Sequence, residues 1–509
     1  MLWTWRSIGA AGRAAVIGSA LALAIAAAAT SCAIAAGHDE LAPVTMSEVT
    51  GPPATTTTVL AGRPAVVAAD AASRLFASAA VVVVANVSNK AGLAVAAARA
   101  RRAHAPLLLA SARSAAVALR AEIHALAARE VLDTGMAAGP LVAELPGVRV
   151  VTNPARLPVT RFPRPLRHVV VLVRRQDVSA GTQAATATAL AAGAQVITMH
   201  NHDPRADSAA IAALSRVRPR QVLAVGDGFG PARRLASRVA VAATGVQLPG
   251  GGQVLFPMHR LLALYGCPGT PALGALGQRG LTDAIARIRR IAAAYQPLSS
   301  VPVVPAFEII ATVAQASPGP RGIYSAESAV ASLRPWVGRA TANGMYVVLD
   351  LQPGRASLLA QARRYRELLR LPSVGLALDP EWKLGPGQLP LRQIGHVDIS
   401  EVNRVIGWLA WLTGRYHLPQ KLLVLHQFRL SMIADEQRLD TGHDGIAIVI
   451  HMDGQGTPAD KFNTWNAVVS SAPPSVFFGW KNFYDKDHPT LSPPQTMVNR
   501  PEPVMISYQ

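Results

Sequence analysis

Residues 374–382 read VGLALDPEW, a short apolar run followed directly by two acids, a proline and a tryptophan. Unbroken apolar runs of this length are typical of strands that are buried on both faces of a parallel sheet. We therefore expect a strand over residues 374–379, with Asp379, Glu381 and Trp382 at or just beyond its C-terminal end.

Seven further runs of this kind occur in residues 261–509, and helical patterns separate most of them. Eight strands within about 250 residues match the count and length of a (β/α)8 barrel, the TIM barrel. An open doubly wound α/β sheet is the alternative. The other expected strands cover residues 261–265, 301–310, 345–350, 421–425, 446–450, 475–478 and 503–507. The expected helices cover residues 325–342, 358–369, 398–416 and 458–468.

The ends of these strands carry acids, histidines, amides and aromatics, and in a TIM barrel such ends form one active face. This mixture suits a sugar, because carboxylates perform the chemistry, amides hold hydroxyls and indole rings stack on pyranoses. Glycosidic cleavage needs two acidic functions at one bond. Asp379 and Glu381 are two apart, so on a strand they point to the same side, where one can raise the pKa of the other.

We expect Glu381 to act as general acid, with Asp379 or Asp350 as the assisting carboxylate. For Trp480 the alternative to sugar stacking is packing against other side chains. For His426 and His451 the alternative to substrate binding is a position at the edge of the core. The expected substrate-binding residues are Glu308, Trp382, His426, Gln427, His451, Asp453 and Trp480.

Residues 374–381 resemble the strand-four motif of family 18 glycoside hydrolases, D-G-x-D-x-D-x-E. The resemblance implies Glu381 as general acid and Asp379 as the partner that orients an acetamido group of the substrate. Two earlier acids of the motif are replaced by Val374 and Ala377. A non-catalytic glycan-binding barrel is therefore the alternative to a hydrolase.

The region of residues 65–248 contains an internal α/β repeat, with copies at about residues 65–150 and 166–243. Each copy alternates short apolar runs with Ala-rich helical patterns, which predicts a doubly wound parallel sheet. The expected strands are residues 81–85, 105–109, 130–133, 169–173, 194–198 and 220–226. The expected helices are residues 91–102, 115–128, 184–192 and 208–216.

These copies resemble the cell wall-binding repeat 2 family of Gram-positive bacteria. The matching segments are AN (85–86), LAVAA (93–97), APLLL (105–109) and VLAVGDG (222–228). The resemblance implies a doubly wound fold that docks non-covalently onto anionic wall polymers. Two copies are visible where the family has three, and the family's closing Gly-Gly pair is absent. A purely structural module is the alternative.

The N-terminus predicts export. Arg6 and Arg13 precede an uncharged apolar run, and residues 29–32, ATSC, resemble a lipobox in which Cys32 is acylated. Ordinary cleavage after Ala35 and an uncleaved anchor are the alternatives. We therefore expect residues 1–32 to be a signal peptide and residues 33–64, which contain Thr, Pro and Gly, to be a flexible tether. Farther along the chain, we expect residues 249–260 to be an interdomain linker. We expect membrane-anchored, wall or extracellular localisation.

Composition indicates the partners. The formal net charge of +19 favours anionic wall polymers, other envelope glycans or lipid headgroups, although a base-composition bias of the source is the alternative. No nucleic-acid motif is present, and we expect no nucleic-acid partner. Only two cysteines occur, so no disulfide framework is expected and Cys267 is structural. We expect no cofactor, and residues 200–203, HNHD, are expected to form a solvated turn rather than a metal site.

Overall fold

A computed structural model describes residues 45–50, 55–110, 116–134, 146–158, 160–161 and 165–509. The expected signal peptide and Cys32 lie outside the described residues. Among the residues described, no helix combines the length and the apolar character that crossing a bilayer requires.

The C-terminal half forms a closed barrel of eight parallel strands, which confirms the TIM-barrel prediction over the open sheet. Each strand pairs with its neighbours in chain order, and β13 closes the barrel by pairing with both β14 and β23. The barrel strands are β13 Arg260–Gly266, β14 Val303–Ala314, β16 Tyr346–Leu351, β17 Val374–Leu378, β19 Lys421–Gln427, β21 Ile446–Met452, β22 Phe477–Asn482 and β23 Met505–Tyr508.

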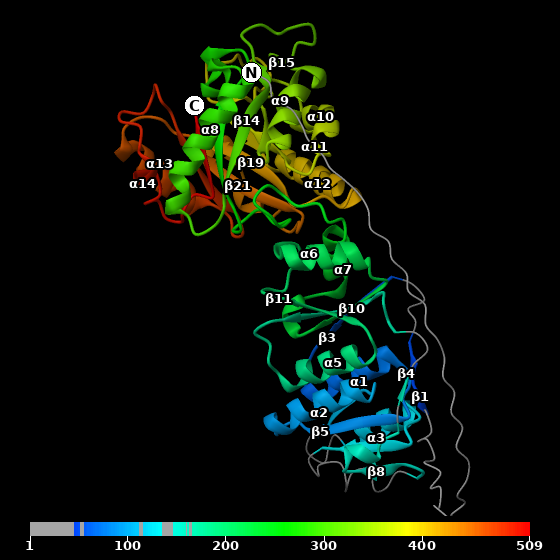
Figure 1. Ribbon diagram of the computed structural model, residues 1–509. Helices are drawn as coiled ribbons and strands as arrows, with labels where there is room; N and C mark the ends of the chain where they lie inside the picture. The colour runs from blue at the N-terminus through cyan, green and yellow to red at the C-terminus, as the bar shows by residue number, and fades with distance from the viewer. Residues whose placement is uncertain (1–44, 51–54, 111–115, 135–145, 159, 162–164) are drawn as a thin grey trace, which may run out of the picture. The chain divides into compact units, whose positions relative to one another are not determined.

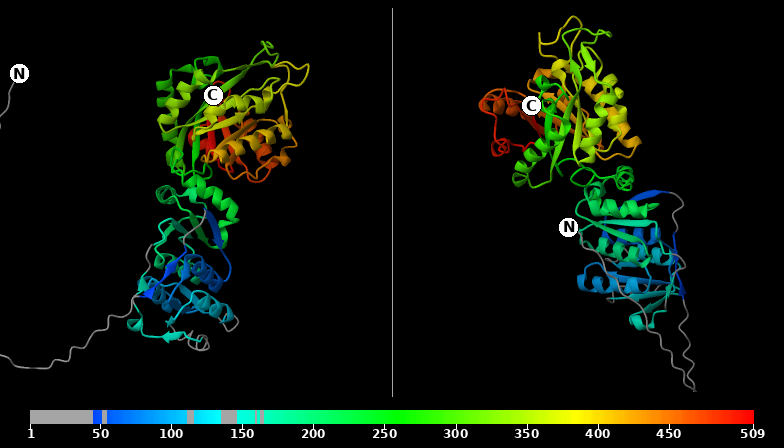
Figure 2. Two further views of the ribbon diagram at one scale, coloured as in Figure 1. Left: turned by 90° about the vertical axis from the view of Figure 1, so that its right-hand side faces the viewer. Right: turned by 45° about the horizontal axis from the view of Figure 1, so that its top comes forward.

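Helices surround the barrel strands (Figures 1 and 2). The helices are α8 Leu281–Tyr295, α9 Val330–Ala342, α10 Leu358–Arg364, α11 Arg366–Leu369, α12 Ile399–Arg415, α13 Pro458–Ser471 and α14 Pro493–Thr496. One expected helix was too long, because β15 (Ser325–Glu327) pairs antiparallel with the end of β14. A short two-strand pair joins β18 (Val397–Asp398) to β20 (Ile433–Ala434).

Side chains alternate along the barrel strands between an outer and an inner apolar cluster. Outward residues such as Leu262 and Leu349 pack against the helices, whereas Ala263, Ala306 and Val424 fill the barrel interior. This two-residue period is inherent in strand geometry. It also determines which residues at the strand ends face inward.

Part of the expected linker belongs to the barrel core. Leu255 and Phe256 are 1% and 3% exposed and join the inner cluster. Gln253 is fully buried and donates to the carbonyls of Val241 and Val246. The glycine-rich turn before them has the composition of a linker, which is why the sequence did not reveal that the residues after it are buried.

The N-terminal half contains two parallel four-stranded sheets, ordered β6-β5-β7-β8 and β11-β10-β12-β3. In Figure 1, helices α1, α2 and α5 lie between them, and α1 and α2 each contact α5. The strands are β3 Thr56–Leu60, β5 Val81–Asn86, β6 Leu107–Ala110, β7 Glu130–Asp133, β8 Arg149–Val151, β10 Val169–Arg174, β11 Gln195–Met199 and β12 Gln221–Val225. The helices are α1 Pro64–Leu75, α2 Lys90–Arg102, α3 Ala116–Ala125, α5 Ala180–Ala191, α6 Ser208–Val217 and α7 Ala232–Ala242. The family resemblance of this region stays a prediction.

Residues of the expected tether also enter the fold. β3 (Thr56–Leu60) pairs along its length with β12, and Leu60 is 1% exposed. The strands β1 (Thr45–Met46) and β2 (Glu48–Val49) pair with β9 (Thr160–Arg161) and β4 (Phe76–Ser78). Threonine and valine are β-branched and favour strands, so the threonine-rich composition was misleading here.

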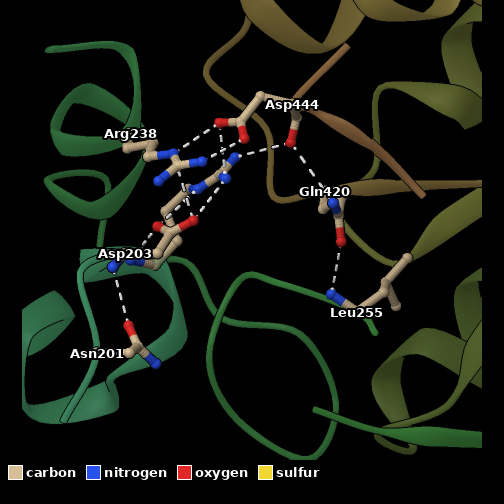
Figure 3. A network of polar contacts seen from close by, with 7 residues as sticks. Asn201, Asp203, Arg238, Leu255, Gln420 and Asp444 are labelled. Carbon is tan, nitrogen blue, oxygen red and sulfur yellow. Dashed lines mark hydrogen bonds and ion pairs between the residues drawn. The ribbon is translucent and has the colours of Figure 1, made fainter. Parts of the chain in front are cut away.

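A polar network links α7 and the loop after β11 to the loop before β21 (Figure 3). Arg205 donates to Asp203 at 2.8 Å and to Asp444 at 2.8 Å, and Arg238 forms a bidentate pair with Asp444 at 2.6 and 2.8 Å. The Gln420 side chain accepts from the backbone of Leu255 at 2.9 Å.

Candidate functional site

Each of the eight barrel strands, or the residue directly after it, presents a polar side chain to the interior on the C-terminal side of the apolar core. The residues two positions earlier are small or apolar, for example Ala263, Ala306, Val348 and Val449. The barrel therefore changes abruptly from an apolar core to a polar layer. The polar layer consists of Tyr265, Glu308, Asp350, Asp379, His426, His451, Lys481 and Ser507, all of them buried.

His426 bridges two carboxylates in the centre of this layer. Its Nε2 lies 3.0 Å from Glu308 Oε1, and its Nδ1 lies 3.2 Å from Asp453 Oδ2. Burial alone would lower the pKa of His426, but Glu308 and Asp453 raise that pKa well above its usual value. A carboxylate at each ring nitrogen favours the doubly protonated imidazolium.

Lys481 supplies the second positive charge. Its Nζ lies 3.5 Å from the centroid of the Tyr265 ring and 4.0 Å from Asp453 Oδ2. The hydroxyl of Tyr265 donates to Asp350 Oδ2 at 2.9 Å and accepts from Gln352 at 3.4 Å. Tyr265 thus ties the lysine side of the layer to Asp350.

Asp379 and Glu381 stand where β17 gives way to a short 3-10 turn, Pro380–Trp382. The strand ends one residue earlier than expected, so the turn, and not strand alternation, presents Glu381 to the cavity. The turn is fixed at both ends. The backbone of Asp379 donates to Leu351 at 3.1 Å, and Gly395 donates to the carbonyl of Glu381 at 2.7 Å.

A cavity of about 290 Å³ opens above the polar layer. Two carboxyls line it, Glu381 and Asp453, together with Lys481. Its size is close to the lower end of ligand pockets, about 300 Å³, and suits a ligand of one or two sugar rings. The remaining lining side chains are largely aromatic or apolar and include Tyr265, Trp382, Phe428 and Phe483.

Several buried polar atoms of the layer and of the cavity wall have no hydrogen-bond partner within the described part of the protein. They include Oε2 of Glu308, Oδ1 of Asp350, Asp379 and Asp453, and Nε1 of Trp382. Buried polar atoms in native proteins are normally paired. Such a concentration of acceptors around one cavity fits a ligand that carries many hydroxyls.

Charge balance explains which carboxyls have raised pKa values. The site holds five carboxyls but two cations, His426 and Lys481, so two carboxylates are compensated and three are not. His426 lowers the pKa of Glu308 and of Asp453, against the effect of burial, which would raise both. The uncompensated carboxyls are Asp350, Asp379 and Glu381.

The pKa values of these three carboxyls are raised accordingly. Burial raises the pKa of Asp350 to about 6, and burial together with Asp453 raises that of Glu381 to about 7. Burial, followed by the charges of Glu381 and Asp350, raises the pKa of Asp379 well above its ordinary value. Glu381 and Asp453 therefore share one cavity with their pKa values displaced in opposite directions.

The structure corrects the expected roles of two residues. Trp480 is fully buried outside the barrel, with its ring 5.7 Å from that of Trp465, and does not line the cavity. Gln427 also points outward and donates to Glu436 at 3.1 Å. Trp480 adjoins the inward residue Lys481, and Gln427 adjoins the inward residue His426. Because successive side chains of a strand point to opposite faces, both point outward.

His451 belongs to the layer but lies beneath the cavity. It is fully buried, and its Nε2 is 2.8 Å from the hydroxyl of Ser507. Burial lowers the pKa of His451 to about 4, so its ring is neutral at physiological pH. A role in supporting the layer fits this position better than contact with a substrate.

The sequence analysis missed Tyr265, Lys481 and Ser507. In the sequence, Tyr265 ends an apolar run and Lys481 follows a tryptophan, so neither stands out as a site residue. Every second residue of a strand faces the same side. Once Ala263 is known to face the barrel interior, counting two residues onward identifies Tyr265 as an inward residue.

No grouping of three or more histidine, cysteine or acidic side chains suited to a metal ion occurs in the described ranges. The HNHD segment is engaged locally: His200 Nδ1 lies 3.1 Å from Asp207 Oδ2, and His202 packs edge-on against Phe229. Comparisons of the chain with protein-family models, with curated proteins and with solved structures find no match. Both family resemblances therefore stay predictions.

Proposed function

We propose that the barrel hydrolyses a glycosidic bond of an envelope or extracellular glycan, with Glu381 as general acid and Asp453 as the ionised carboxylate. The observation that carries this proposal is the pair itself. Two carboxyls line one cavity, and their surroundings hold one protonated near neutral pH and the other ionised. Such displaced pairs are the usual mark of an acid and its partner.

In this reaction the Glu381 carboxyl gives its proton to the glycosidic oxygen as the bond to the anomeric carbon breaks. The Asp453 carboxylate stabilises the positive charge that develops on the sugar, and water completes the cleavage. His426 and Lys481 keep Asp453 ionised. The sequence predicts Asp379 or Asp350 as the assisting carboxylate, but Asp379 is 2% exposed and has a raised pKa, so a neutral hydrogen-bonding role suits it better.

The aromatic lining supports a sugar substrate. Trp382 and Phe428 offer flat apolar faces, while the indole N–H and the unpaired carboxyl oxygens offer polar partners. This combination of a mostly apolar wall and a few placed polar groups is typical of small-ligand sites.

The test is hydrolysis of a panel of wall and capsule glycans by the wild type and by Glu381→Gln and Asp453→Asn, with binding measured in parallel. Both variants should still bind the substrate but lose turnover. For Glu381→Gln, which removes the general acid, the loss should be about 10²–10⁴-fold. Binding without any hydrolysis by the wild type would instead indicate a glycan-binding barrel. Turnover that survives both substitutions would place the active site elsewhere.

We also propose that the protein is exported and that residues 65–248 bind anionic wall polymers. The repeat resemblance and the net charge of +19 support this. The full chain should sediment with purified cell walls at low salt, where charge attraction is least screened, and should stay in the supernatant once the anionic polymers are stripped.

For the anchor, we propose acylation of Cys32. Cys32→Ala should then move the protein from the membrane fraction to the medium or leave an uncleaved precursor. An unchanged distribution together with an unchanged mature mass would rule the lipid anchor out.

A further inference from the structure

A second hollow lies on the outside of the barrel, between α10, α11 and α12. It has a volume of about 670 Å³ and is formed by side chains of all three helices, of which α10 and α12 pack against each other. We call it the Arg-Trp groove. Its lining residues are Leu359, Arg363, Arg366, Arg404, Gly407, Trp408 and Trp411.

Helical spacing arranges these residues in two facing rows. On α12, Arg404, Trp408, Trp411 and Arg415 follow one another at intervals of three or four, which places them along one stripe. Leu359, Arg363, Arg366 and Arg370 repeat with the same spacing along α10, α11 and the residue that follows. Arginines thus run along both walls of the groove.

These arginines are exposed and make no direct ion pair among the described residues. Within the part of the chain that the structure describes, none of Arg363, Arg366, Arg370, Arg404 and Arg415 forms an ion pair with a carboxylate. Their neighbours behave differently, since Arg334 pairs with Glu367 and Arg364 with Glu327. The positive charge of the groove is therefore available to a partner.

Aromatic rings hold the guanidinium groups in place. Arg366 lies 5.9 Å from the Trp411 ring and donates to the Tyr416 hydroxyl at 3.0 Å, and Arg370 lies 4.3 Å from the Tyr416 ring. Trp411 is nonetheless 52% exposed. Exposed tryptophan beside arginine is the composition that dominates binding hot spots.

We propose that the Arg-Trp groove binds an anionic polysaccharide as a site separate from the catalytic cavity. Guanidinium groups recognise carboxylate or phosphate substituents in a planar, bidentate way, and the indole faces offer a surface for sugar rings. A groove suits an extended chain, whereas a membrane would call for apolar side chains that protrude. Of the large apolar side chains that line the groove, Trp411 alone is mostly exposed.

Gly407 gives a test that changes no charge. It lies on the groove stripe of α12, and a Cβ added there would meet no atom within 4 Å. The Cβ of Gly407→Leu therefore has free space, and the rest of the side chain extends toward the groove. The change also replaces a weak helix former by a strong one, so the variant should fold. Its hydrolysis of a short soluble substrate should equal that of the unsubstituted protein.

The experiment uses the full chain and titration calorimetry with a polygalacturonate oligomer, in a Glu381→Gln background so that the probe is not consumed. The methyl-esterified oligomer is the matched neutral probe. Binding of the acid form should weaken by at least about tenfold in Gly407→Leu and in Trp411→Ala, in line with the loss of a hot spot. Arg366→Gln with Arg404→Gln should lower both the affinity and its salt dependence. Arg290→Gln with Arg339→Gln, at exposed positions on α8 and α9, removes the same two charges away from the groove and is the charge-matched control.

Three outcomes would overturn the proposal. Equal binding of the neutral ester would remove the role of charge. A loss in Arg290→Gln with Arg339→Gln as large as that in Arg366→Gln with Arg404→Gln would indicate a diffuse charge effect. Tighter binding of duplex DNA or of anionic phospholipid vesicles, abolished by Gly407→Leu, would assign the groove to a different class of partner.

Discussion

Replacing Asp350 by asparagine should stabilise the protein at neutral pH. Asp350 is fully buried in the polar layer, and its pKa is raised to about 6 from an ordinary 3.8. A carboxyl with a raised pKa favours the folded state while it is protonated. Its contribution is fully present below about pH 4 and is lost as the pH rises through about 6.

The magnitude follows from that shift. Two pKa units, at about 1.4 kcal/mol each, give a penalty on the order of 3 kcal/mol at pH 7, as an upper limit. Asparagine has the same shape, keeps an oxygen that accepts from Tyr265 and carries no charge. The free energy of unfolding should therefore be higher in Asp350→Asn at pH 7, and the gain should shrink toward zero at pH 4.

Urea unfolding followed by tryptophan fluorescence is the assay. Every tryptophan from Trp336 onward lies in the barrel, so the signal reports on the barrel alone once the first residues, with Trp3 and Trp5, are removed. The control is Asp485→Asn, the same change at an exposed position. A variant that is no more stable than the wild type at pH 7, or a gain that does not depend on pH, would refute the charge-balance reasoning.

Three further results are expected. Hydrolysis should fall as the pH rises through about 7, because Glu381 then loses the proton that it must donate; a rate that stays constant to pH 9 would contradict this. Trp480→Phe should lower the free energy of unfolding by on the order of 2 kcal/mol through lost packing and leave KM unchanged, whereas a sugar-stacking residue would raise KM. Asp444→Asn should weaken the bonds from Arg205 and Arg238, cost about 2 kcal/mol and speed proteolysis of residues 249–260, which limited digestion with thermolysin, a protease that cuts before apolar residues such as Val254 and Leu255, would measure.

The barrel could be predicted because its strands are buried on both faces. Their unbroken apolar runs stand out from the helical patterns between them, and all eight expected strands lie within a few residues of the observed ones. The same property conceals which face each residue occupies. Trp480 and Lys481 differ by one position, and which of them points inward follows from the two-residue period only once an inner residue of the strand is known.

Other features depend on partners that are distant in sequence. The strand at Thr56–Leu60 is held by β12, and Leu255 and Phe256 are buried by residues from several barrel strands. The protonation states of the site are similarly non-local, since they follow from a count of charges that converge from separate strands. Strand-end chemistry suggested the acids, but the role of Asp453 became visible only with its two cations in place.

The most direct test of Glu381 as general acid compares two substrates that differ in leaving group. A glycoside with a poor leaving group needs protonation of the departing oxygen, whereas a dinitrophenyl glycoside of the same sugar does not. Glu381→Gln should therefore lower kcat/KM by about 10²–10⁴-fold on the first substrate and by far less on the second. An equal loss on both substrates would contradict the assignment of Glu381 as the proton donor.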